Sequence, residues 1–313
     1  MKILMFGRGV ISTLYGWALE GAGNTIDFYV RPGRANQLGS QVKLNIYDLR
    51  QKEEQNQHIH QNWTINLRED LPVDHDYDMI IVSVAHYRFS EVASFLSTRA
   101  SRATILILNN FWEDPQAASV DLPQSQLAWG FPAAGGGFQP NSELYGALFP
   151  KLEFGTFGTE PTGREVVARK VFNDAGFAFG EHRNFREWLW VHFAVSAAVT
   201  AEQLRAGKPR RDIYENKDHS MEKAVRVVRE VMPVLSARGI KIEDHPELSF
   251  FNQPEVTVAE SLGKLLGSPA FQAAIDGHTN HEELVRMFSD VLEESHRLGI
   301  VVPLLDDAKR FLK

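Results

Sequence analysis

The fold is decided by Lys2–Ser12, whose sequence is KILMFGRGVIS. Its first five residues are an apolar run typical of a buried strand, and a Gly-Arg-Gly turn follows directly. A helical pattern then continues to Glu20, Gly21 and Gly23 end it, and Ile26–Val30 (IDFYV) is a second β-rich run. This order of strand, glycine turn, helix and strand indicates the first βαβ unit of a dinucleotide-binding domain.

The residues of the turn have distinct physical roles in such a unit. A first glycine permits the tight bend, and a second lets the backbone approach a pyrophosphate. The N–H groups that open the helix then face that anion. The third fingerprint position, usually Gly for close helix–strand packing, is Ser12 here, which is a small departure. The predicted pyrophosphate-binding residues are therefore Gly7, Arg8, Gly9, Val10 and Ile11.

The end of the second strand indicates which dinucleotide is bound. An NAD site places Asp or Glu there for the ribose 2′-hydroxyl, whereas an NADP site offers cations to the 2′-phosphate. Here the strand ends in Val30 and runs into Arg31-Pro32-Gly33-Arg34, while Asp27 lies at its other end. Seen alone, such a turn is a solvated basic loop. After this βαβ unit, two guanidinium groups, of Arg31 and Arg34, favour NADP(H).

The composition limits the class of protein. A chain of 313 residues favours two domains, each able to bury a core. The net charge of −7 argues against a nucleic-acid partner, and the absence of Cys excludes disulfides, thiolate metal sites and cysteine nucleophiles. No run approaches about 20 unbroken apolar residues. The start of the chain shows no signal-peptide pattern, so we expect a cytoplasmic protein without a membrane segment.

Strands and helices alternate through the first half of the chain. The apolar runs Met79–Val84 and Thr104–Leu108 indicate parallel strands buried on both faces, with a helix over Phe89–Arg99 between them. Later segments continue the pattern, with strands over Leu127–Phe131 and Leu152–Phe157, a helix over Glu165–Ala175, and polar and glycine-rich connections at Arg50–Gln61 and Ala133–Phe138. The glycines at 135–137 suit a loop over a cleft or, as we favour, a tight turn between antiparallel strands. The alternation predicts a doubly wound parallel sheet of the Rossmann type.

The second half of the chain is helical. Helices are predicted over Arg186–Ala201, Met221–Arg238, Val256–Leu266 and His281–Leu298. The second of these is strongly amphipathic, and its apolar stripe suits either internal packing or a dimer interface. We therefore expect an NADP-binding Rossmann domain over residues 1–183 and an all-α domain for substrate binding or dimerisation over residues 184–313.

Together these features resemble the ketopantoate reductase (2-dehydropantoate 2-reductase) family. Its members pair an N-terminal NADPH-binding Rossmann domain with a helical domain, and reduce a 2-keto acid in the cleft between them. The resemblance spans the chain in architecture and is strongest at Gly7–Ser12 and at Val30-Arg31. It continues at Leu106–Asn109, where the family has a strand ending in Asn near the nicotinamide, and at Trp190–Ser196, which is similar to the first long helix of the family's second domain.

The departures from the family pattern lie on the substrate side. Where the family helix has a catalytic Lys and, one turn later, an Asn that holds substrate, this sequence has His192 and Ser196. Ala85 stands where a further Lys usually follows a Rossmann strand, and the family's late motif with its catalytic Glu has no counterpart between Ser249 and Asn280. The resemblance therefore implies the fold and the cofactor and leaves the substrate open.

Several side chains are candidates for the chemistry. His192 suits protonation of a developing alkoxide, because imidazole has an ordinary pKa of about 6.5; the alternative is a buried core histidine. Asn109 ends a strand at the ligand-binding edge, where it would orient the reacting centre or cap a loop. Ser196 shares a helix face with His192, or its hydroxyl bonds its own helix. Ser83 and Val84 end a neighbouring strand and are expected to contact the cofactor through their backbone.

Two further patterns, a histidine pair and two tryptophans, give weaker indications of function. His278 and His281 lie three residues apart, but without a third ligand in a fixed frame they predict no metal site, and Asn280 instead suits a helix cap. Trp188 and Trp190 favour packing, and they suggest a bulkier and more apolar cleft than a small keto acid needs.

The sequence thus predicts an NADPH-dependent oxidoreductase that reduces a 2-keto acid or another small-molecule carbonyl by hydride transfer. True 2-dehydropantoate reduction is a rival, weakened by the missing lysines that would meet the substrate carboxylate. The alternative from another class is a non-catalytic protein that binds or senses NADP(H). The helical domain also offers a surface for a homodimer.

Overall fold

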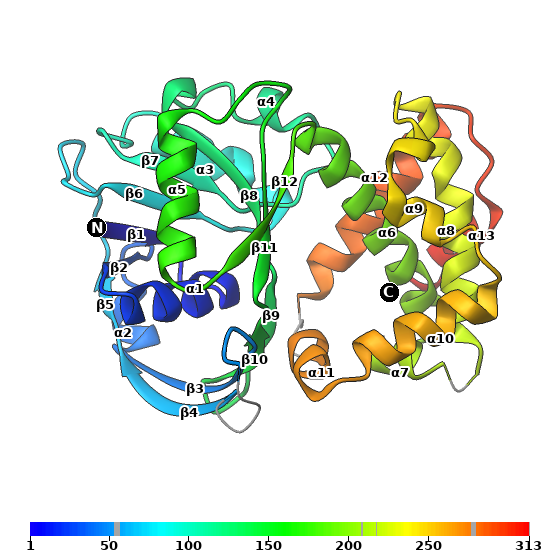
Figure 1. The fold of residues 1–313 in the computed structure, drawn as a ribbon, viewed down its shortest axis with the longest axis horizontal. Helices are drawn as coiled ribbons and strands as arrows, with labels where there is room; N and C mark the ends of the chain where they lie inside the picture. Colours follow the sequence, from blue (N-terminus) through cyan, green and yellow to red (C-terminus); the bar gives the residue numbers. More distant parts are fainter. Residues whose placement is uncertain (53–56, 208, 217, 277–279, 313) are drawn as a thin grey trace. The chain divides into compact units, whose positions relative to one another are not determined.

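The computed structural model describes residues 1–52, 57–207, 209–216, 218–276 and 280–312, and His278 of the histidine pair therefore lies outside the described residues. The chain forms two compact units, Met1–Phe185 and Arg186–Lys313, each with its own core (Figure 1). The boundary between residues 183 and 184 expected from the sequence lies just before this division.

The opening of the chain folds in the predicted order. Strand β1 (Lys2–Phe6) leads through the glycine turn into helix α1 (Val10–Gly21), and strand β2 (Thr25–Tyr29) follows. The middle residues of β1 are fully buried, as expected of a central parallel strand. Helix α1 ends where its apolar pattern ends, at the Gly21–Gly23 segment.

The main sheet has eight strands in the described residues, in the order β12-β11-β8-β7-β6-β1-β2-β5. The strands not yet located are β5 (Asn66–Arg68), β6 (Met79–Val82), β7 (Thr104–Ile107), β8 (Leu127–Phe131), β11 (Lys151–Gly155) and β12 (Ala178–His182). The neighbouring strands β8, β7, β6, β1, β2 and β5 run parallel to one another, whereas β11 pairs with β8 in the antiparallel sense. The predicted Rossmann fold class is confirmed, with one antiparallel pairing near an edge.

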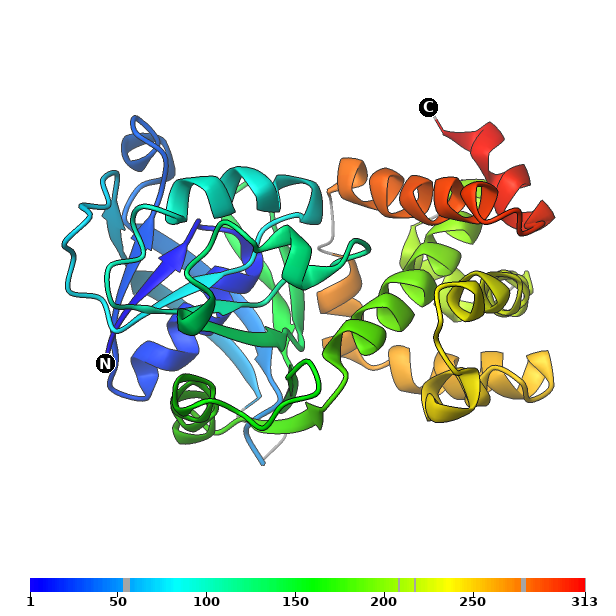
Figure 2. The ribbon, with the colours of Figure 1, turned by 90° about the horizontal axis from the view of Figure 1, so that it is seen from above.

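Helices cover both faces of this sheet. Helix α3 (Phe89–Leu96) lies on one face, and α1 and α5 (Gly163–Asp174) lie on the other (Figure 2). Helix α5 begins at a capping box, in which Thr162 and Glu165 bond each other's backbone N–H. Short helical turns complete the unit: α2 (Ala35–Leu38), η2 (His86–Arg88), α4 (Pro115–Ala118) and η3 (Gln124–Gln126).

A second, four-stranded sheet lies on the far side of α1, in the order β4-β3-β10-β9. Its strands are β3 (Gln41–Asp48), β4 (His58–Thr64), β9 (Ala134–Phe138) and β10 (Glu143–Leu148). Alternate residues of β3 are buried against α1, so this helix is packed between two sheets. We did not predict this sheet from the sequence. The described end of the polar stretch expected as a loop or strand connection belongs to β4.

The glycine run at 135–137 is neither a loop nor a tight turn, which corrects the prediction. It lies within β9 and pairs antiparallel with β10. Gly136 has φ +149°, and a Cβ there would collide with the backbone of Tyr145 and Gly146 on the facing strand. A Cβ on Gly146 would likewise collide with Gly135. Glycine is therefore required by the close approach of two strands rather than by chain reversal.

The second unit is helical throughout its described part. Its helices are α6 (Phe185–Ala206), α7 (Arg210–Glu215), α8 (Ser220–Ala237), α9 (Pro246–Phe250), α10 (Glu255–Leu266), α11 (Pro269–Asp276), α12 (His281–Arg297) and α13 (Pro303–Ala308), with 3₁₀ turns η4 (Ile242–Asp244) and η5 (Lys309–Phe311). The apolar stripe of α8 is buried from Met221 to Leu235. It therefore packs inside this unit and is not left for a dimer. No helix among the described residues is long and apolar enough to cross a membrane.

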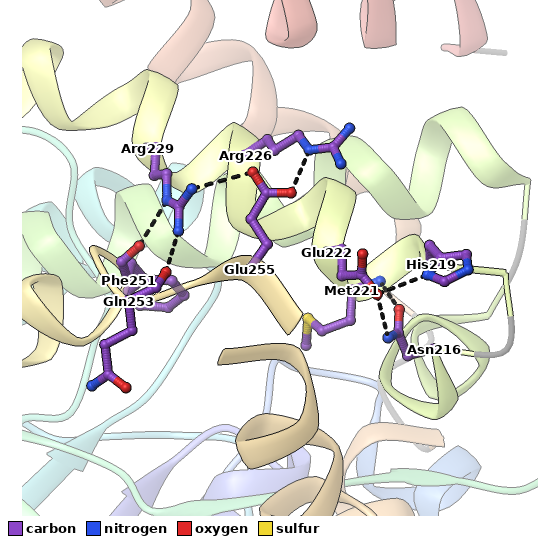
Figure 3. A network of polar contacts seen from close by, with 9 residues as sticks. All are labelled: Asn216, His219, Met221, Glu222, Arg226, Arg229, Phe251, Gln253 and Glu255. Atoms are coloured by element: carbon purple, nitrogen blue, oxygen red, sulfur yellow. Dashed lines mark hydrogen bonds and ion pairs between the residues drawn. The ribbon is translucent and has the colours of Figure 1, made fainter. Parts of the chain in front are cut away.

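A polar network fastens α8 to the start of α10 (Figure 3). Glu255 accepts hydrogen bonds from Arg226 (Nε to Oε2, 2.7 Å) and from Arg229 (Nη1 to Oε1, 3.2 Å). Arg229 also donates to the carbonyl oxygens of Phe251 and Gln253. One guanidinium thus satisfies backbone carbonyls after α9 as well as a carboxylate, which fixes the α9–α10 connection against α8.

Candidate functional site

The strand register brings most of the predicted residues to one edge of the main sheet. Phe6 at the end of β1 lies beside Tyr29 and Val82, and Val82 lies beside Ile107. The carboxyl ends of β2, β1, β6 and β7 are therefore aligned, and the residues that follow them emerge at the same edge. From β1 the chain passes to β2 on one side and later to β6 on the other. The point between β1 and β6 is thus a topological switch point, where open α/β sheets bind ligands.

The glycine turn leaves open space at this edge. Gly7 has φ +98°, which favours glycine, and its N–H donates to the carbonyl of Tyr29 at 2.9 Å. Gly9 has φ −80° and ψ 176°, a conformation open to any residue, and a Cβ on it would meet no atom within 4 Å. The fold itself therefore does not require Gly9. A backbone that a ligand must approach closely would require it.

Unsatisfied polar groups surround the turn. The Nε and Nη2 atoms of Arg8 and the hydroxyl of Ser12 are buried without a hydrogen-bond partner among the described residues. The Arg8 guanidinium lies 4.7 Å from the ring centre of Phe138, and burial lowers its pKa. Buried donors without acceptors cost free energy. An anion bound at the turn would supply the acceptors that the described residues do not.

The two arginines after β2 are exposed. Their loop closes through the Arg34 N–H, which donates to the carbonyl of Arg31 at 3.1 Å. In the described part of the chain, neither guanidinium makes a hydrogen bond or an ion pair. Asp27 sits inside β2, buried, and accepts from the Tyr77 hydroxyl at 2.7 Å and from Arg68 Nε at 3.3 Å. As expected, Asp27 is not the carboxylate of an NAD-type strand end.

A carboxylate that no pattern in the sequence indicated reaches this loop from the neighbouring strand. Strand β5 pairs with β2, and the Val30 N–H donates to the carbonyl of Arg68 at 2.8 Å. Glu69 follows directly, and its Oε1 accepts the N–H of Ala35 at 2.6 Å. No local pattern could have revealed this, because β5 joins β2 only in the folded sheet.

Three aromatic rings lie at the same edge and were not predicted as site residues. Phe6 and Tyr29 stack with ring centres 4.9 Å apart, and Phe95 of α3 lies 5.2 Å from Tyr29. The Arg99 guanidinium lies 4.6 Å above the Phe95 ring. Phe95 is half-buried.

Asn109 braces the ends of β6 and β7. Its side chain is buried, its Nδ2 donates to the Val84 carbonyl at 2.6 Å, and its Oδ1 accepts the Val84 N–H at 3.1 Å. This holds Ser83 and Val84, both half-buried, at the carboxyl end of β6. Beside it, Oδ1 of Asn110 is buried without a partner among the described residues. The structure thus shows that the Asn109 side chain holds in place the loop that we predicted to contact the cofactor.

His192 and Ser196 lie in the helical unit, one turn apart on α6. Both are half-buried, whereas Phe193 and Ala197 beside them are buried, so the pair shares one face as expected. The His192 ring stacks on Trp188 with centres 5.3 Å apart. Trp190 lies under the Arg238 guanidinium at 3.8 Å, which is the packing role favoured for the tryptophans.

A cavity of about 290 Å³ lies elsewhere in the helical unit, among α7, α10 and α11. Its walls include Arg211, Tyr214 and Lys264, and none of the candidate residues lines it. Within the described residues, no group of three or more His, Asp or Glu side chains could hold a metal ion. The candidate site is therefore the edge of the main sheet, with α6 as a separate candidate region.

Comparisons with known proteins relate the chain to one family. Residues 3–156 match the family model described as ketopantoate reductase PanE/ApbA. A 2-dehydropantoate 2-reductase from Pyrococcus abyssi (strain GE5 / Orsay) is 25% identical over 267 residues, which cover 82% of this chain and 81% of that protein.

Two solved structures share the fold along nearly the whole chain. One is the ternary structure of D-mandelate dehydrogenase with NADH and anilino(oxo)acetate, at TM-score 0.72 and 15% identity, covering 99% of this chain and 96% of that one. The other is the dimeric ketopantoate reductase from Staphylococcus aureus, at TM-score 0.64 and 11% identity, covering 99% and 98%. At these identities the structures show a common fold.

Proposed function

Since residues 3–156 belong to the ketopantoate reductase family, and the chain as a whole is related to one of its members, we propose that the protein is an NADPH-dependent oxidoreductase that reduces a 2-keto acid or another carbonyl compound. One observation carries the cofactor part of the proposal. At one edge of the sheet lie an open glycine turn, whose buried donors have no acceptor among the described residues, and two exposed arginines that pair with no described side chain.

The residues at this edge fit a nicotinamide dinucleotide. The pyrophosphate would lie on the backbone of Gly7–Ile11, where Arg8 and Ser12 offer donors. The ring of Phe95 is suited to the adenine, and Arg31 and Arg34 to the 2′-phosphate. The loop at Ser83 and Val84, clamped by Asn109, would face the nicotinamide side. When bound, the cofactor supplies the hydride for carbonyl reduction.

The helical unit would supply the groups on the substrate side. As hydride adds to the carbonyl carbon, the oxygen needs a proton, which imidazolium at His192 can give at neutral pH. Ser196 on the same face would hydrogen-bond the substrate. Because Ala85 stands where the family has a further lysine, a substrate carboxylate would lack a cationic partner there. We therefore favour a larger or more apolar carbonyl compound over ketopantoate.

The test has two stages on one sample. Fluorescence titration with NADPH and NADH in parallel measures binding, and NADPH oxidation is then followed with a panel of carbonyl compounds that includes apolar ketones, 2-keto acids and ketopantoate. We expect NADPH to bind more tightly than NADH, and turnover with at least one apolar carbonyl compound. Failure to bind either dinucleotide would contradict the proposal. Binding without turnover on any carbonyl would instead indicate a dinucleotide-binding or sensing protein.

We also propose a homodimer, because a related fold is dimeric in the Staphylococcus aureus enzyme. The apolar stripe of α8 is used inside the unit, so such a dimer would use other surfaces. Light scattering coupled to gel filtration measures the mass directly, and a mass of one 35.3 kDa chain would contradict this proposal.

A further inference from the structure

The loop proposed to read the 2′-position of the dinucleotide carries opposite charges from two strands. Arg31 and Arg34 come from the end of β2, and Glu69 and Asp70 come from the end of β5. Strands β2 and β5 are paired up to Tyr29 and Arg68, and the N–H of the next residue, Val30, donates to the Arg68 carbonyl. The two strand ends therefore leave the sheet side by side.

Glu69 does not form an ion pair with either arginine among the described residues. Its carboxylate instead accepts the Ala35 N–H at 2.6 Å. Backbone N–H groups, of Ala35 first and then of Gly33 and Arg34, hold the pKa of Glu69 below its ordinary value. The carboxylate therefore stays ionised at neutral pH and stays beside the arginine loop, while neither guanidinium group forms an ion pair with any residue that the structure describes.

We propose that Glu69 selects between the two dinucleotides at this loop, an inference that rests on the proposed function. A carboxylate here accepts the 2′-hydroxyl of an NADH ribose, as an acidic residue at the end of the second strand does in NAD sites. The same carboxylate repels a 2′-phosphate held by Arg31 and Arg34. The preference for NADPH is then a balance between two cations and one anion, rather than the result of an absent carboxylate.

The rival role for Glu69 is structural, since its bond to Ala35 also closes the loop. Two substitutions separate the roles. Glu69→Gln keeps an oxygen that can accept the Ala35 N–H and removes the charge, whereas Glu69→Ala removes both. Asp70→Asn is the matched control, because Asp70 is an exposed acid next in sequence, with no hydrogen bond to the loop among the described residues.

The measurement is the dissociation constant of NADPH and of NADH for each variant, at low and at physiological salt. We expect Glu69→Gln to raise the preference for NADPH over NADH about ten-fold at low salt, and less at higher salt, because the repulsion between exposed charges is screened. Asp70→Asn should change this ratio about two-fold or less, since it removes one charge at a residue that makes no hydrogen bond to the arginine loop among the described residues.

The measured ratios distinguish a role of Glu69 in dinucleotide selection from a structural role in the loop. If Glu69→Gln leaves the ratio unchanged, or if Glu69→Gln and Glu69→Ala weaken both dinucleotides equally, Glu69 only shapes the loop and the inference is overturned. If Asp70→Asn raises the preference for NADPH over NADH as much as Glu69→Gln does, the inference is also overturned, because the effect then depends only on the net charge near the loop. If the wild-type protein binds neither dinucleotide, the proposed function itself is overturned. That result comes from the wild-type protein alone and does not depend on the Glu69 variants.

Discussion

The two units of the chain carry their proposed chemistry in different ways. In the N-terminal unit, contiguous residues build a loop whose backbone and flanking cations face one edge of a sheet, and neighbouring strands add Ser83, Val84 and Glu69. In the helical unit, the proposed groups are two side chains, His192 and Ser196, one turn apart on helix α6. A site made from backbone leaves a pattern in the sequence, whereas a site made from side chains on a regular helix does not.

Replacement of His192 tests the helical side of this contrast and has the largest expected effect. We expect His192→Gln to lower kcat by roughly 10²- to 10⁴-fold, the usual loss when a general acid is removed, with the NADPH dissociation constant unchanged. Steady-state kinetics and fluorescence titration give the two values.

The control is His296→Gln, because His296 is an exposed histidine of the same unit, paired with Asp306 at 2.8 Å. If kcat with the best substrate survives in His192→Gln as it does in the control, His192 is a packing residue and the helical unit must use another group.

Replacement of Gly9 tests the backbone side. We expect Gly9→Val to weaken both dinucleotides about 100-fold, because the side chain fills space that the pyrophosphate needs. The fold should be unaffected, since Gly9 has an unstrained φ and its Cβ would meet no atom within 4 Å. Thermal unfolding and titration distinguish the two effects. Gly21→Val, at the far end of the same helix and equally free of contacts, should bind normally. Unchanged binding in Gly9→Val would place the dinucleotide elsewhere.

Removal of Arg31 sharpens the comparison within the cofactor loop. We expect Arg31→Ala to weaken NADPH by roughly 10- to 100-fold and NADH by less than about three-fold, since charge-assisted bonds to a phosphate are lost. Parallel titrations measure both constants. Arg102→Ala is the control, as an exposed arginine that precedes β7 and so lies towards the opposite edge of the sheet. Equal losses for both dinucleotides would refute a 2′-phosphate at Arg31.

The smallest expected effect concerns the stability of the helical unit. Glu255→Ala removes the acceptor shared by Arg226 and Arg229, and we expect it to lower the free energy of unfolding by about 1 kcal/mol. Urea unfolding measures this value, with Glu260→Ala on the exposed face of α10 as the control. Dinucleotide binding should be unchanged in both variants. A loss in Glu255→Ala no larger than in the control would mean that the network adds nothing measurable to stability.

Much of the fold could be predicted because its signals are local. The buried strands β1, β6 and β7 are short apolar runs, and α8 shows the period of a half-buried helix. The four-stranded sheet could not be predicted in this way, because β4 is largely exposed and reads as a polar connection. The glycines of β9 resemble a turn until the facing strand is known, since the contact that requires them comes from β10.

The sequence by itself determined the βαβ unit, the glycine turn, the exposed arginine loop and the helical character of the second half, because each depends on residues close together in the chain. Only the tertiary structure decided that Asn109 clamps Val84, that Phe95 joins the aromatic rings at the sheet edge, and that Glu69 reaches the loop of Arg31 and Arg34. These contacts join strands and helices distant in sequence. Parallel strand pairing, which brings them together, depends on the packing of the whole sheet.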